Sequence, residues 1–358
     1  MKRMVAGAAA LACFLTAQPI PAQACTTFCV KAGDSVLFGR NYDFEIGGGA
    51  LFVNTRGLKK RGFAPNGPEW AAAYGSVTFN QFGRDFPMGG MNEKGLVVEL
   101  AWLDVTEYPA PDNRAELGVL EWIQYQLDTA ATVADVVKSN AAVRISGVAP
   151  LHYLVSDPTG AAATIEFLGG RLVVHTNESL PVTVLANTSY EDSLRFWRRK
   201  GESSLPRGSG SEARFARTAT QLGTMTGVSG RQAIDRAFSI LGNVAQRSTR
   251  WSIVYDQTAQ IVYFRTDTHH DVRLLQTSAL NFSCSGPVRL VDLDLKAGGD
   301  ISAHLVPYSA EANQLLVNKN YRASSVTRRT PPSEIQAIAD HPALATCSSK
   351  ESAPDRVD

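Results

Sequence analysis

The sequence has few cysteines, few charged residues and no excess of charge of one sign, and each shortage argues against a class of protein. Its 358 residues include 5 Cys without any C-x-x-C or H-E-x-x-H spacing, which disfavours a disulfide scaffold and a zinc framework. Lys and Arg number 35 against 34 Asp and Glu, so the basic surplus typical of nucleic-acid binding is missing. Because 44% of the residues are hydrophobic and only 19% are charged, the chain can bury a large core.

Several motifs of catalysis and ligand binding are also missing. The sequence has no G-x-S-x-G nucleophile elbow and no glycine-rich phosphate loop, which disfavours a serine hydrolase and a nucleotide-binding enzyme. The run His269-His270-Asp271 could suggest a metal site. However, adjacent residues on a strand point to opposite faces, and no third ligand has a recognisable spacing. We therefore expect neither a metal nor another cofactor.

Residues 1–24 have the three parts of a secretory signal peptide. Lys2 and Arg3 form a positive region, Val5–Leu15 is apolar, and Ala22-Gln23-Ala24 is an A-x-A cleavage site. The apolar stretch is shorter than the about 20 residues needed to cross a bilayer, and no later segment comes closer to that length. We expect cleavage after Ala24 and a secreted protein without stable membrane insertion.

Cleavage after Ala24 would make Cys25 the first residue, with a thiol and a free α-amine on the same Cα. An amine of pKa about 7.7–8.0 can accept the proton of a thiol of pKa about 8.5, so one residue would supply both a nucleophile and its base. Two alternatives remain open: Cys25 is lipidated, or its position is a coincidence. A lipoprotein signal usually has an aliphatic residue, most often Leu, three positions before the cysteine, where this chain has Ala22.

The segment after Cys25 predicts a β-hairpin. Two β-rich runs, Cys25–Val30 and Ser35–Asn41, flank a Gly-Asp turn. In such a hairpin Arg40 and Asp43 return beside Cys25, where a guanidinium favours the thiolate and a carboxylate can hold the α-amine. A surface Arg and Asp in an ordinary turn is the alternative. A hairpin in place of a flexible tether weighs against lipidation.

The rest of the chain predicts a mixed α+β fold, because runs of strands alternate with helical blocks. We expect strands at Ala72–Val77, Gly95–Leu103, Leu151–Ser156, Ala163–Phe167, Val182–Ala186, Trp251–Tyr255, Ile261–Arg265 and Val272–Gln276. We expect helices at Ala115–Thr129, Val133–Ser139, Ser211–Thr224 and Arg231–Leu241.

The composition changes near the C-terminus. From Arg322 the chain is rich in Ser, Thr, Arg and Pro, so we place a boundary between a main domain at 25–321 and an extension at 322–358. The extension should contain a short helix at Pro332–Asp340 and end in a flexible tail. Cys284 and Cys347 can form a disulfide in an oxidising compartment, although their spacing does not require one. We interpret Cys29 as a small buried core thiol on the same strand face as Cys25.

Five short segments resemble the choloylglycine hydrolase family, which contains bile salt hydrolases and penicillin V acylases. They are Cys25–Phe28, Phe38–Asp43, Met91–Leu96, Val184–Asn187 and Ala213–Arg217. The resemblance covers roughly residues 25–295. It implies an N-terminal nucleophile (Ntn) hydrolase that cleaves linear amides, with a four-layer αββα sandwich of two antiparallel sheets flanked by helices.

The resemblance also implies catalytic roles for five residues: Cys25, Arg40, Asp43, Asn187 and Arg214. Cys25 matches the nucleophile and its α-amine the base, while Arg40 and Asp43 match the pair beside it. Asn187 matches the side-chain donor of the oxyanion hole. Arg214 aligns with the remaining arginine, in preference to Arg217, because it directly precedes the Phe. Without the resemblance, Asn187 would be interpreted as a turn residue and Arg214 as an exposed helix charge.

The sequence departs from the family pattern at Trp102, where many Gram-positive members have an oxyanion-hole Asn. A backbone N–H could replace that Asn, and the indole could stack on an acyl group. The short stretch between Asn187 and Arg214 and the signal peptide resemble the secreted Gram-negative branch, which is associated with penicillin V and acyl-homoserine lactones. We therefore expect a periplasmic enzyme.

Its expected partner is a small amide substrate whose apolar acyl group contacts Phe44, Trp102 and Tyr108. Bile salt hydrolysis is an alternative activity. A non-catalytic periplasmic lipoprotein or binding module, lipidated at Cys25, is the alternative class. The oligomeric state, including a homo-oligomer, is left open.

Overall fold

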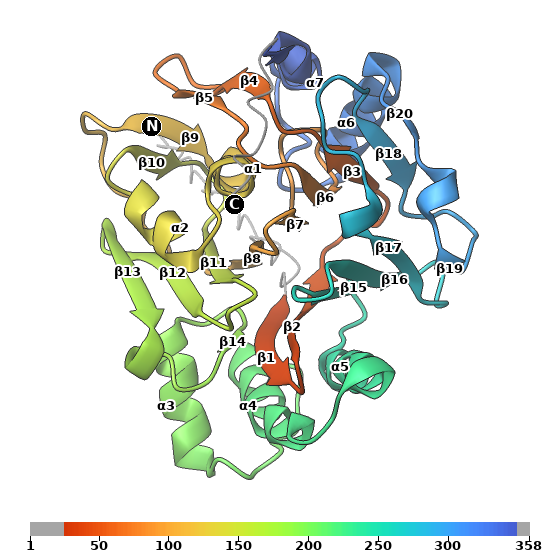
Figure 1. Cartoon of the computed structure of the whole chain (residues 1–358). Helices are drawn as coiled ribbons and strands as arrows, with labels where there is room; N and C mark the ends of the chain where they lie inside the picture. The colour runs from red at the N-terminus through yellow and green to blue at the C-terminus, as the bar shows by residue number, and fades with distance from the viewer. Residues whose placement is uncertain (1–24, 349–358) are drawn as a thin grey trace, which may run out of the picture.

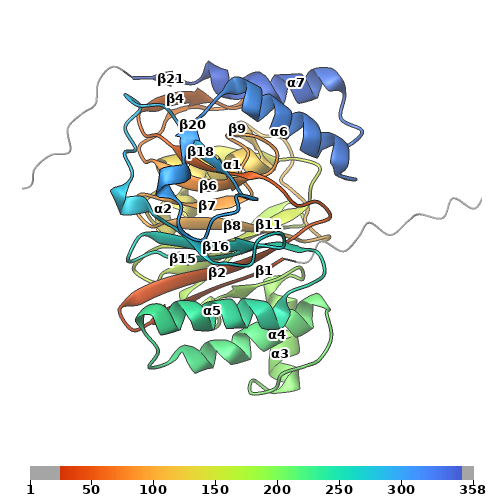
Figure 2. The same cartoon turned by 90° about the vertical axis from the view of Figure 1, so that its right-hand side faces the viewer.

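Two stacked β-sheets with helices on both outer sides build the protein, as the computed structural model shows for residues 25–348 (Figures 1 and 2). Figure 2 shows the layers edge on, with α3, α4 and α5 below one sheet and α6 and α7 above the other. This is the predicted α+β, four-layer αββα arrangement, which the structure confirms. The proposed signal peptide lies outside the described residues, as do residues 349–358 of the expected tail.

The first sheet has seven strands and carries the N-terminal hairpin. Its order is β14 (Val184–Leu185), β1 (Thr26–Ala32), β2 (Ser35–Asp43), β15 (Thr249–Asp256), β16 (Ile261–Thr266), β17 (Arg273–Gln276) and β19 (Gly299–Asp300). Neighbouring strands are antiparallel except β17 and β19. The register of β1 on β2 pairs Thr26 with Asn41 and Thr27 with Arg40, so the predicted hairpin is confirmed.

The second sheet has nine antiparallel strands. Its order is β13 (Arg171–Thr176), β12 (Ala162–Leu168), β11 (Leu151–Ser156), β8 (Val97–Trp102), β7 (Gly89–Asn92), β6 (Ser76–Asn80), β3 (Ala50–Asn54), β18 (Arg289–Asp292) and β20 (Val306–Pro307). Two smaller sheets pair β9 (Ala115–Gly118) with β10 (Val143–Ser146), and β4 (Leu58–Arg61) with β5 (Glu69–Ala71) and β21 (Thr346–Cys347). The central strands are buried on both faces because each large sheet lies between its partner sheet and a helical layer.

In the part of the chain that the structure describes, seven α-helices cover the two sheets. They are α1 (Val119–Thr129), α2 (Val133–Ser139), α3 (Tyr190–Lys200), α4 (Ser211–Leu222), α5 (Gly230–Val244), α6 (Ala310–Ala323) and α7 (Pro332–Asp340). Short 3₁₀ turns lie at Asn177–Ser179, Gly223–Met225, Thr277–Ala279, Ser302–His304 and His341–Leu344. Within residues 25–348, no helix combines the length and apolar character that a membrane crossing needs.

The helix expected at Ala115–Thr129 is wrong in its first turn. Ala115–Gly118 forms β9, which pairs in parallel with β10, and the helix begins only at Val119. The Glu121 carboxylate accepts a hydrogen bond from the Gly118 N–H at 3.0 Å, which marks this boundary. The strand expected at Ala72–Val77 is displaced to Ser76–Asn80, because the chain bends at Ala73 and Tyr74. A Cβ at Gly75 would collide with Phe282.

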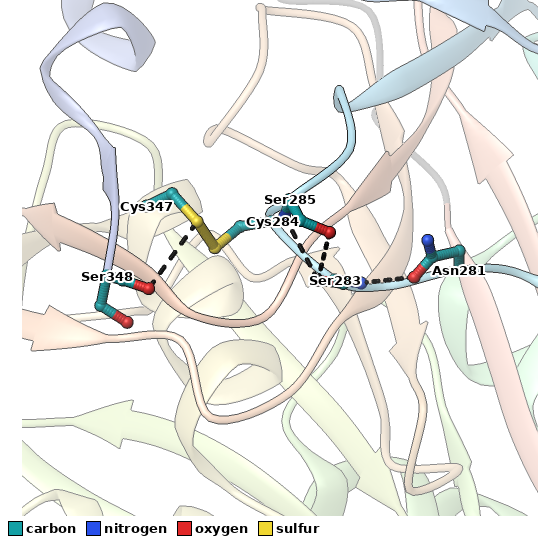
Figure 3. The surroundings of a disulfide bond; sticks show 6 residues. All are labelled: Asn281, Ser283, Cys284, Ser285, Cys347 and Ser348. Atoms are coloured by element: carbon teal, nitrogen blue, oxygen red, sulfur yellow. Dashed lines mark hydrogen bonds between the residues drawn. A yellow bond between two sulfur atoms is a disulfide. The ribbon is translucent and has the colours of Figure 1, made fainter. Parts of the chain in front are cut away.

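The C-terminal region is tied into the fold. Helix α6, which the sequence did not predict, crosses the boundary expected after residue 321, and α7 occupies the predicted range. A disulfide joins Cys284 to Cys347, with 5.6 Å between the Cα atoms (Figure 3). Strand β21, which carries Cys347, also pairs with β4. The structure thus contains the disulfide that the sequence left open.

Replacing Cys284 and Cys347 together by Ser should lower the free energy of unfolding by about 2–4 kcal/mol, because the unfolded chain is no longer constrained by the crosslink. The two cysteines are 63 positions apart, so the closed loop is long. Urea denaturation of the oxidised protein and the variant measures the difference. If both proteins had the same denaturation midpoint and the same dependence on urea, the crosslink would not be stabilising.

Candidate active site

Cys25 lies at the start of β1, beside the end of β2, and is only 2% exposed. Its side chain lines a cavity of about 310 Å³. The cavity walls are mostly aromatic and aliphatic, including Phe63, Phe82, Phe86, Met88, Leu100 and Leu120. A buried thiol in an apolar cavity can attack a bound acyl group from which water is largely excluded.

Arg40 is fully buried on β2, where its guanidinium forms an ion pair with Glu99 on β8. It also donates to the Met88 carbonyl at 2.5 Å, and the Tyr255 hydroxyl donates to the second Glu99 oxygen at 2.5 Å. A Cβ at Gly89 would overlap the Glu99 carboxylate, so glycine is needed there. The pair joins the two sheets beneath the site.

Sequence reasoning missed Glu99, although a signal was present. It is the one acidic residue in the apolar strand Val97–Trp102, and a buried carboxylate requires a partner. Its partner lies across the sandwich rather than nearby in the sequence, so the pattern alone could not identify Arg40.

Burial, nearby charges and hydrogen bonds from Arg40 and the Asp43 backbone set the pKa of the Cys25 thiol. Burial raises the pKa of the thiol, the neighbouring Arg40 guanidinium lowers it, and the Asp43 carboxylate raises it. Burial is the largest of these effects, so the resting side chain is a neutral thiol. A nearby base is therefore needed to form the thiolate.

Asp43 lies at the end of β2 and accepts a hydrogen bond from the Thr249 hydroxyl. Burial raises the pKa of its carboxyl to about 7, against the opposing effects of Thr249, Arg214 and Arg40. Within the described residues, its second oxygen is buried without a hydrogen-bond partner. The site thus holds a buried carboxyl oxygen that can receive a donor beside Cys25.

Arg214 links the start of β1 to Asn187. On α4, its guanidinium donates to the Cys25 carbonyl at 2.6 Å, to the Thr26 hydroxyl at 2.5 Å and to the Asn187 side-chain oxygen at 2.8 Å. Arg217, one turn later, donates instead to the Pro206 and Gly208 carbonyls at 2.8 and 2.7 Å. Arg214, and not Arg217, therefore reaches the site.

Asn187 is oriented by both ends of its amide. Arg214 holds the oxygen, and one N–H donates to the Trp102 carbonyl at 2.9 Å. Its backbone N–H donates to Ser211 at 2.7 Å. The Trp102 backbone thus positions Asn187, and the second amide N–H is the donor that an oxyanion would need.

A buried His152–Glu166 pair supports the segment around Asn187. Sequence reasoning missed this pair as well. His152 Nδ1 lies 2.9 Å from Glu166, and its Nε2 lies 2.7 Å from the Ala186 carbonyl. Glu166 also accepts from the Tyr190 N–H at 3.0 Å. These contacts fix the chain on both sides of Asn187.

Two of the three residues predicted to contact an acyl group line the cavity. Phe44 and Trp102 do so, and the Trp102 indole N–H donates to Asp104 at 2.6 Å. Tyr108 does not. Its hydroxyl donates to the Ala149 carbonyl at 2.9 Å and its ring packs 5.3 Å from that of Phe167, so it supports the wall from outside.

Cys29 is buried but does not line the cavity. Its sulfur lies 3.9 Å from the Gln257 side-chain oxygen, and burial raises the pKa of its thiol to about 11. Across residues 25–348, no three His, Cys, Asp or Glu side chains cluster in a way that could hold a metal ion.

Replacing Glu99 by Gln removes the negative partner of Arg40 while preserving the side-chain shape. We expect a loss of about 3–5 kcal/mol in the free energy of unfolding, because a buried cation loses its counter-ion. The unpaired charge should also lower the pKa of the Cys25 thiol by favouring the thiolate. Urea denaturation measures the first effect, and the pH dependence of Cys25 alkylation by iodoacetamide measures the second.

Tyr255→Phe is the matched control, because it removes one hydrogen bond to Glu99 without removing a charge. The thiol pKa of this variant should stay near that of the unmodified chain. A Glu99→Gln protein with an unchanged thiol pKa would show that the charge of Arg40 does not reach Cys25.

Comparison with known proteins places this geometry in a family. Residues 25–199 match the profile of the linear amide C–N hydrolases, choloylglycine hydrolase family. A penicillin V acylase from Pectobacterium atrosepticum is 28% identical over an alignment of 283 residues, and the match covers 66% of this chain and 75% of that protein.

Solved structures agree with this result. The structure of penicillin V acylase from Agrobacterium tumefaciens matches with a TM-score of 0.71 and 26% identity, covering 79% of this chain and 98% of that one. A conjugated bile acid hydrolase from Clostridium perfringens shares the fold, with a TM-score of 0.64 and 19% identity over 80% of this chain and 96% of its own. The family predicted from the sequence is thus matched over residues 25–199, and the relatives and the Ntn hydrolase fold indicate an amidohydrolase of linear amides.

Proposed function

We propose that this protein is a secreted, periplasmic acylase that hydrolyses penicillin V-like amides with Cys25 as its N-terminal nucleophile. The observation that carries the proposal is the position of the Cys25 thiol. It lies in an apolar cavity with Asp43 and beside Arg40, while Arg214 connects the Cys25 carbonyl to Asn187. Removal of residues 1–24 would place a free α-amine on the same residue.

In the proposed mechanism the α-amine takes the thiol proton, and the thiolate attacks the amide carbonyl carbon. The second Asn187 N–H donates to the resulting oxyanion, and the ammonium returns its proton to the leaving nitrogen as the C–N bond breaks. The amine then deprotonates a water molecule, whose oxygen attacks the thioester carbonyl carbon. The C–S bond breaks, the acyl group leaves as the carboxylic acid, and the ammonium returns the proton to the Cys25 thiolate. Asp43 accepts a hydrogen bond from the amine, and Arg40 stabilises the thiolate.

The relatives and the cavity support penicillin V as the first substrate to test. Two of the matching proteins, at 28% and 26% identity, are named penicillin V acylases. Phe44 and Trp102 offer flat apolar surfaces for an aryl or aliphatic acyl group. Acyl-homoserine lactones carry the same linear amide and are the second candidate. Bile salts have weaker support, because the bile acid hydrolase is only 19% identical.

A lipidated Cys25 fits the geometry poorly. The side chain is buried in the cavity, so a diacylglyceryl thioether would have to displace its aromatic walls or pull the start of β1 away. Acylation of the amine would also remove the proposed base.

The decisive experiment compares the secreted protein with its Cys25→Ala variant. Intact mass and N-terminal sequencing should give a chain that begins at an unmodified Cys25. The variant should lose about 10³-fold or more of the release of 6-aminopenicillanic acid from penicillin V, because it lacks the nucleophile. Cys29→Ala is the matched control and should retain activity, since Cys29 lies outside the cavity. A lipid-shifted mass, or activity in Cys25→Ala, would refute the mechanism.

The pairing of Asp43 with the amine has its own test. In a chain whose Cys25 amine is blocked by an N-terminal tag, Asp43 has a pKa of about 7, above its unfolded value of about 3.9. Between these values the folded state binds more protons, so stability should fall as pH rises from about 4 to 7, by up to about 1.4 kcal/mol per pH unit.

Asp43→Asn should abolish this pH dependence in the tagged chain. A chain with a free Cys25 amine should show a smaller slope, because the ammonium offsets the buried carboxylate. Urea denaturation at several pH values measures all three proteins. If the free energy of unfolding depends on pH equally with and without the tag, the amine does not interact with Asp43.

A further inference from the structure

We propose that the C-terminal segment Tyr321–Ile338 is the specificity-determining wall of the acyl site and selects neutral acyl groups long enough to reach it. The inference rests on the proposed acylase function and identifies the part of the chain that chooses the acyl group. This segment lies outside residues 25–199, which match the family profile.

The segment contributes to the same cavity as Cys25. Its lining residues come from the end of α6, the connection and α7, and they are Tyr321, Val326, Thr327, Thr330, Glu334 and Ile338. In Figure 2, α6 and α7 lie on the side of the molecule opposite α3–α5, with both sheets between them. The cavity therefore connects the nucleophile on one sheet to the helical layer over the other.

A row of aromatic rings connects the two ends. Tyr42, which lines the cavity with Cys25, stacks on Phe44 with ring centroids 5.6 Å apart. Phe44 meets Phe82 at 6.1 Å, and Phe82 meets Tyr321 of α6 at 5.4 Å. All four rings line the cavity, so a flat or extended apolar group has a continuous surface from the thiol to the C-terminal segment.

The segment is held firmly beside the catalytic hairpin. Glu45, two residues after Asp43, accepts hydrogen bonds from the Ser324 hydroxyl at 2.7 Å and from the Ser325 backbone N–H. On α6, the Asn320 side chain donates to the Gln81 carbonyl at 2.6 Å. These contacts pre-organise the wall, so an acyl group would bind without having to order it.

Helix α7 is fixed in turn. Asn313 of α6 donates to the Ala339 carbonyl at 2.8 Å, and Ile335 and Ile338 pack with Phe86 and Val317 in a buried cluster. A change in the shape of Val326 or Ile338 therefore changes the cavity rather than being absorbed by movement of the helix.

The charges of the lining define the class of acyl group. Among the described residues that line the cavity there are three acids, Asp43, Glu121 and Glu334, and no Lys, Arg or His. Glu121 is only 4% exposed. An acyl group with a terminal carboxylate would lose its hydration beside these acids, and no lining Lys, Arg or His would compensate for that loss. The cavity therefore suits a neutral linear or aryl acyl group.

The test uses amides of 6-aminopenicillanic acid that differ only in the acyl group: butanoyl, hexanoyl, octanoyl, phenoxyacetyl and adipoyl. Val326→Trp, which fills the wall, should lower kcat/KM for octanoyl relative to butanoyl by about tenfold or more. Leu315→Trp is the matched control, because Leu315 is 66% exposed on α6 and does not line the cavity. An unchanged ratio in Val326→Trp, or an equal change in both variants, would overturn the assignment.

Two further arms complete the test. The unmodified enzyme should cleave the hexanoyl amide about tenfold or more faster than the adipoyl amide of the same length, and equal rates would overturn the charge argument. If circular dichroism shows that Val326→Trp is unfolded, Ile338→Ala replaces it. That variant should raise kcat/KM for the octanoyl amide relative to the butanoyl amide. An unchanged ratio would again overturn the assignment of the wall.

A failure of the proposed acylase function gives a different result from a failure of the wall assignment. If the unmodified enzyme cleaves no member of the series, the acylase proposal fails, and calorimetric binding of the neutral amides butanamide and octanamide tests the wall alone. A preference for octanamide that Val326→Trp removes and Leu315→Trp preserves would support the wall. The absence of such a preference would refute it.

Discussion

The buried ion pair between Arg40 and Glu99 is the interaction on which the active site depends. Arg40 comes from β2 of the seven-stranded sheet and Glu99 from β8 of the nine-stranded sheet, so the pair joins the two sheets beside the nucleophile. Taking both charges out of water is costly unless each is well paired. The Met88 carbonyl and Tyr255 hydroxyl meet part of that need. The spacing of the two sheets and the position of the cation beside Cys25 are therefore set together.

Arg214 performs a second joining role, within the seven-stranded sheet and its helical layer. Its guanidinium contacts Cys25, Thr26 and Asn187, which belong to segments far apart in the sequence. Asn187 in turn is held by the Trp102 backbone at the end of β8. Cys25 and Asn187, the proposed nucleophile and oxyanion donor, are thus positioned by a chain of hydrogen bonds across both sheets. A change in any link would alter the distance between the two reacting groups.

The parts of the site that the sequence could predict were local or carried by the family resemblance. Arg40 and Asp43 return to Cys25 through a tight hairpin, whose register follows from a short turn. Helix α7 was predicted at its observed bounds because a Pro begins it and two Ile residues mark its buried face. Asn187 and Arg214 required the resemblance, because each has an ordinary local environment in the sequence.

What the sequence could not predict depends on contacts across the sandwich. The partner of Glu99 and the supporting role of His152 are set by strand order, which periodicity does not encode. Tyr108 was assigned to the acyl site because it follows Trp102 closely in the sequence, but the chain turns after β8 and points its hydroxyl at the backbone behind the wall. The C-terminal lining was missed for the opposite reason. Val326 and Ile338 are far from Cys25 in the sequence, but they line the same cavity.

The burial that makes this site selective also creates its chemical problem. A thiol whose pKa is raised by an apolar cavity is a poor nucleophile, and burial likewise raises the pKa of the neighbouring Asp43 to about 7. The Arg40 charge offsets this only in part, because Glu99 balances it. A base carried on a bulky side chain would have to occupy the space needed by the acyl group. An α-amine on Cys25 itself adds no side chain to the cavity, lies within reach of the thiol, and can receive Asp43 as its acceptor. In a cavity this apolar, the proposed N-terminal nucleophile would thus supply a base with the least loss of substrate volume.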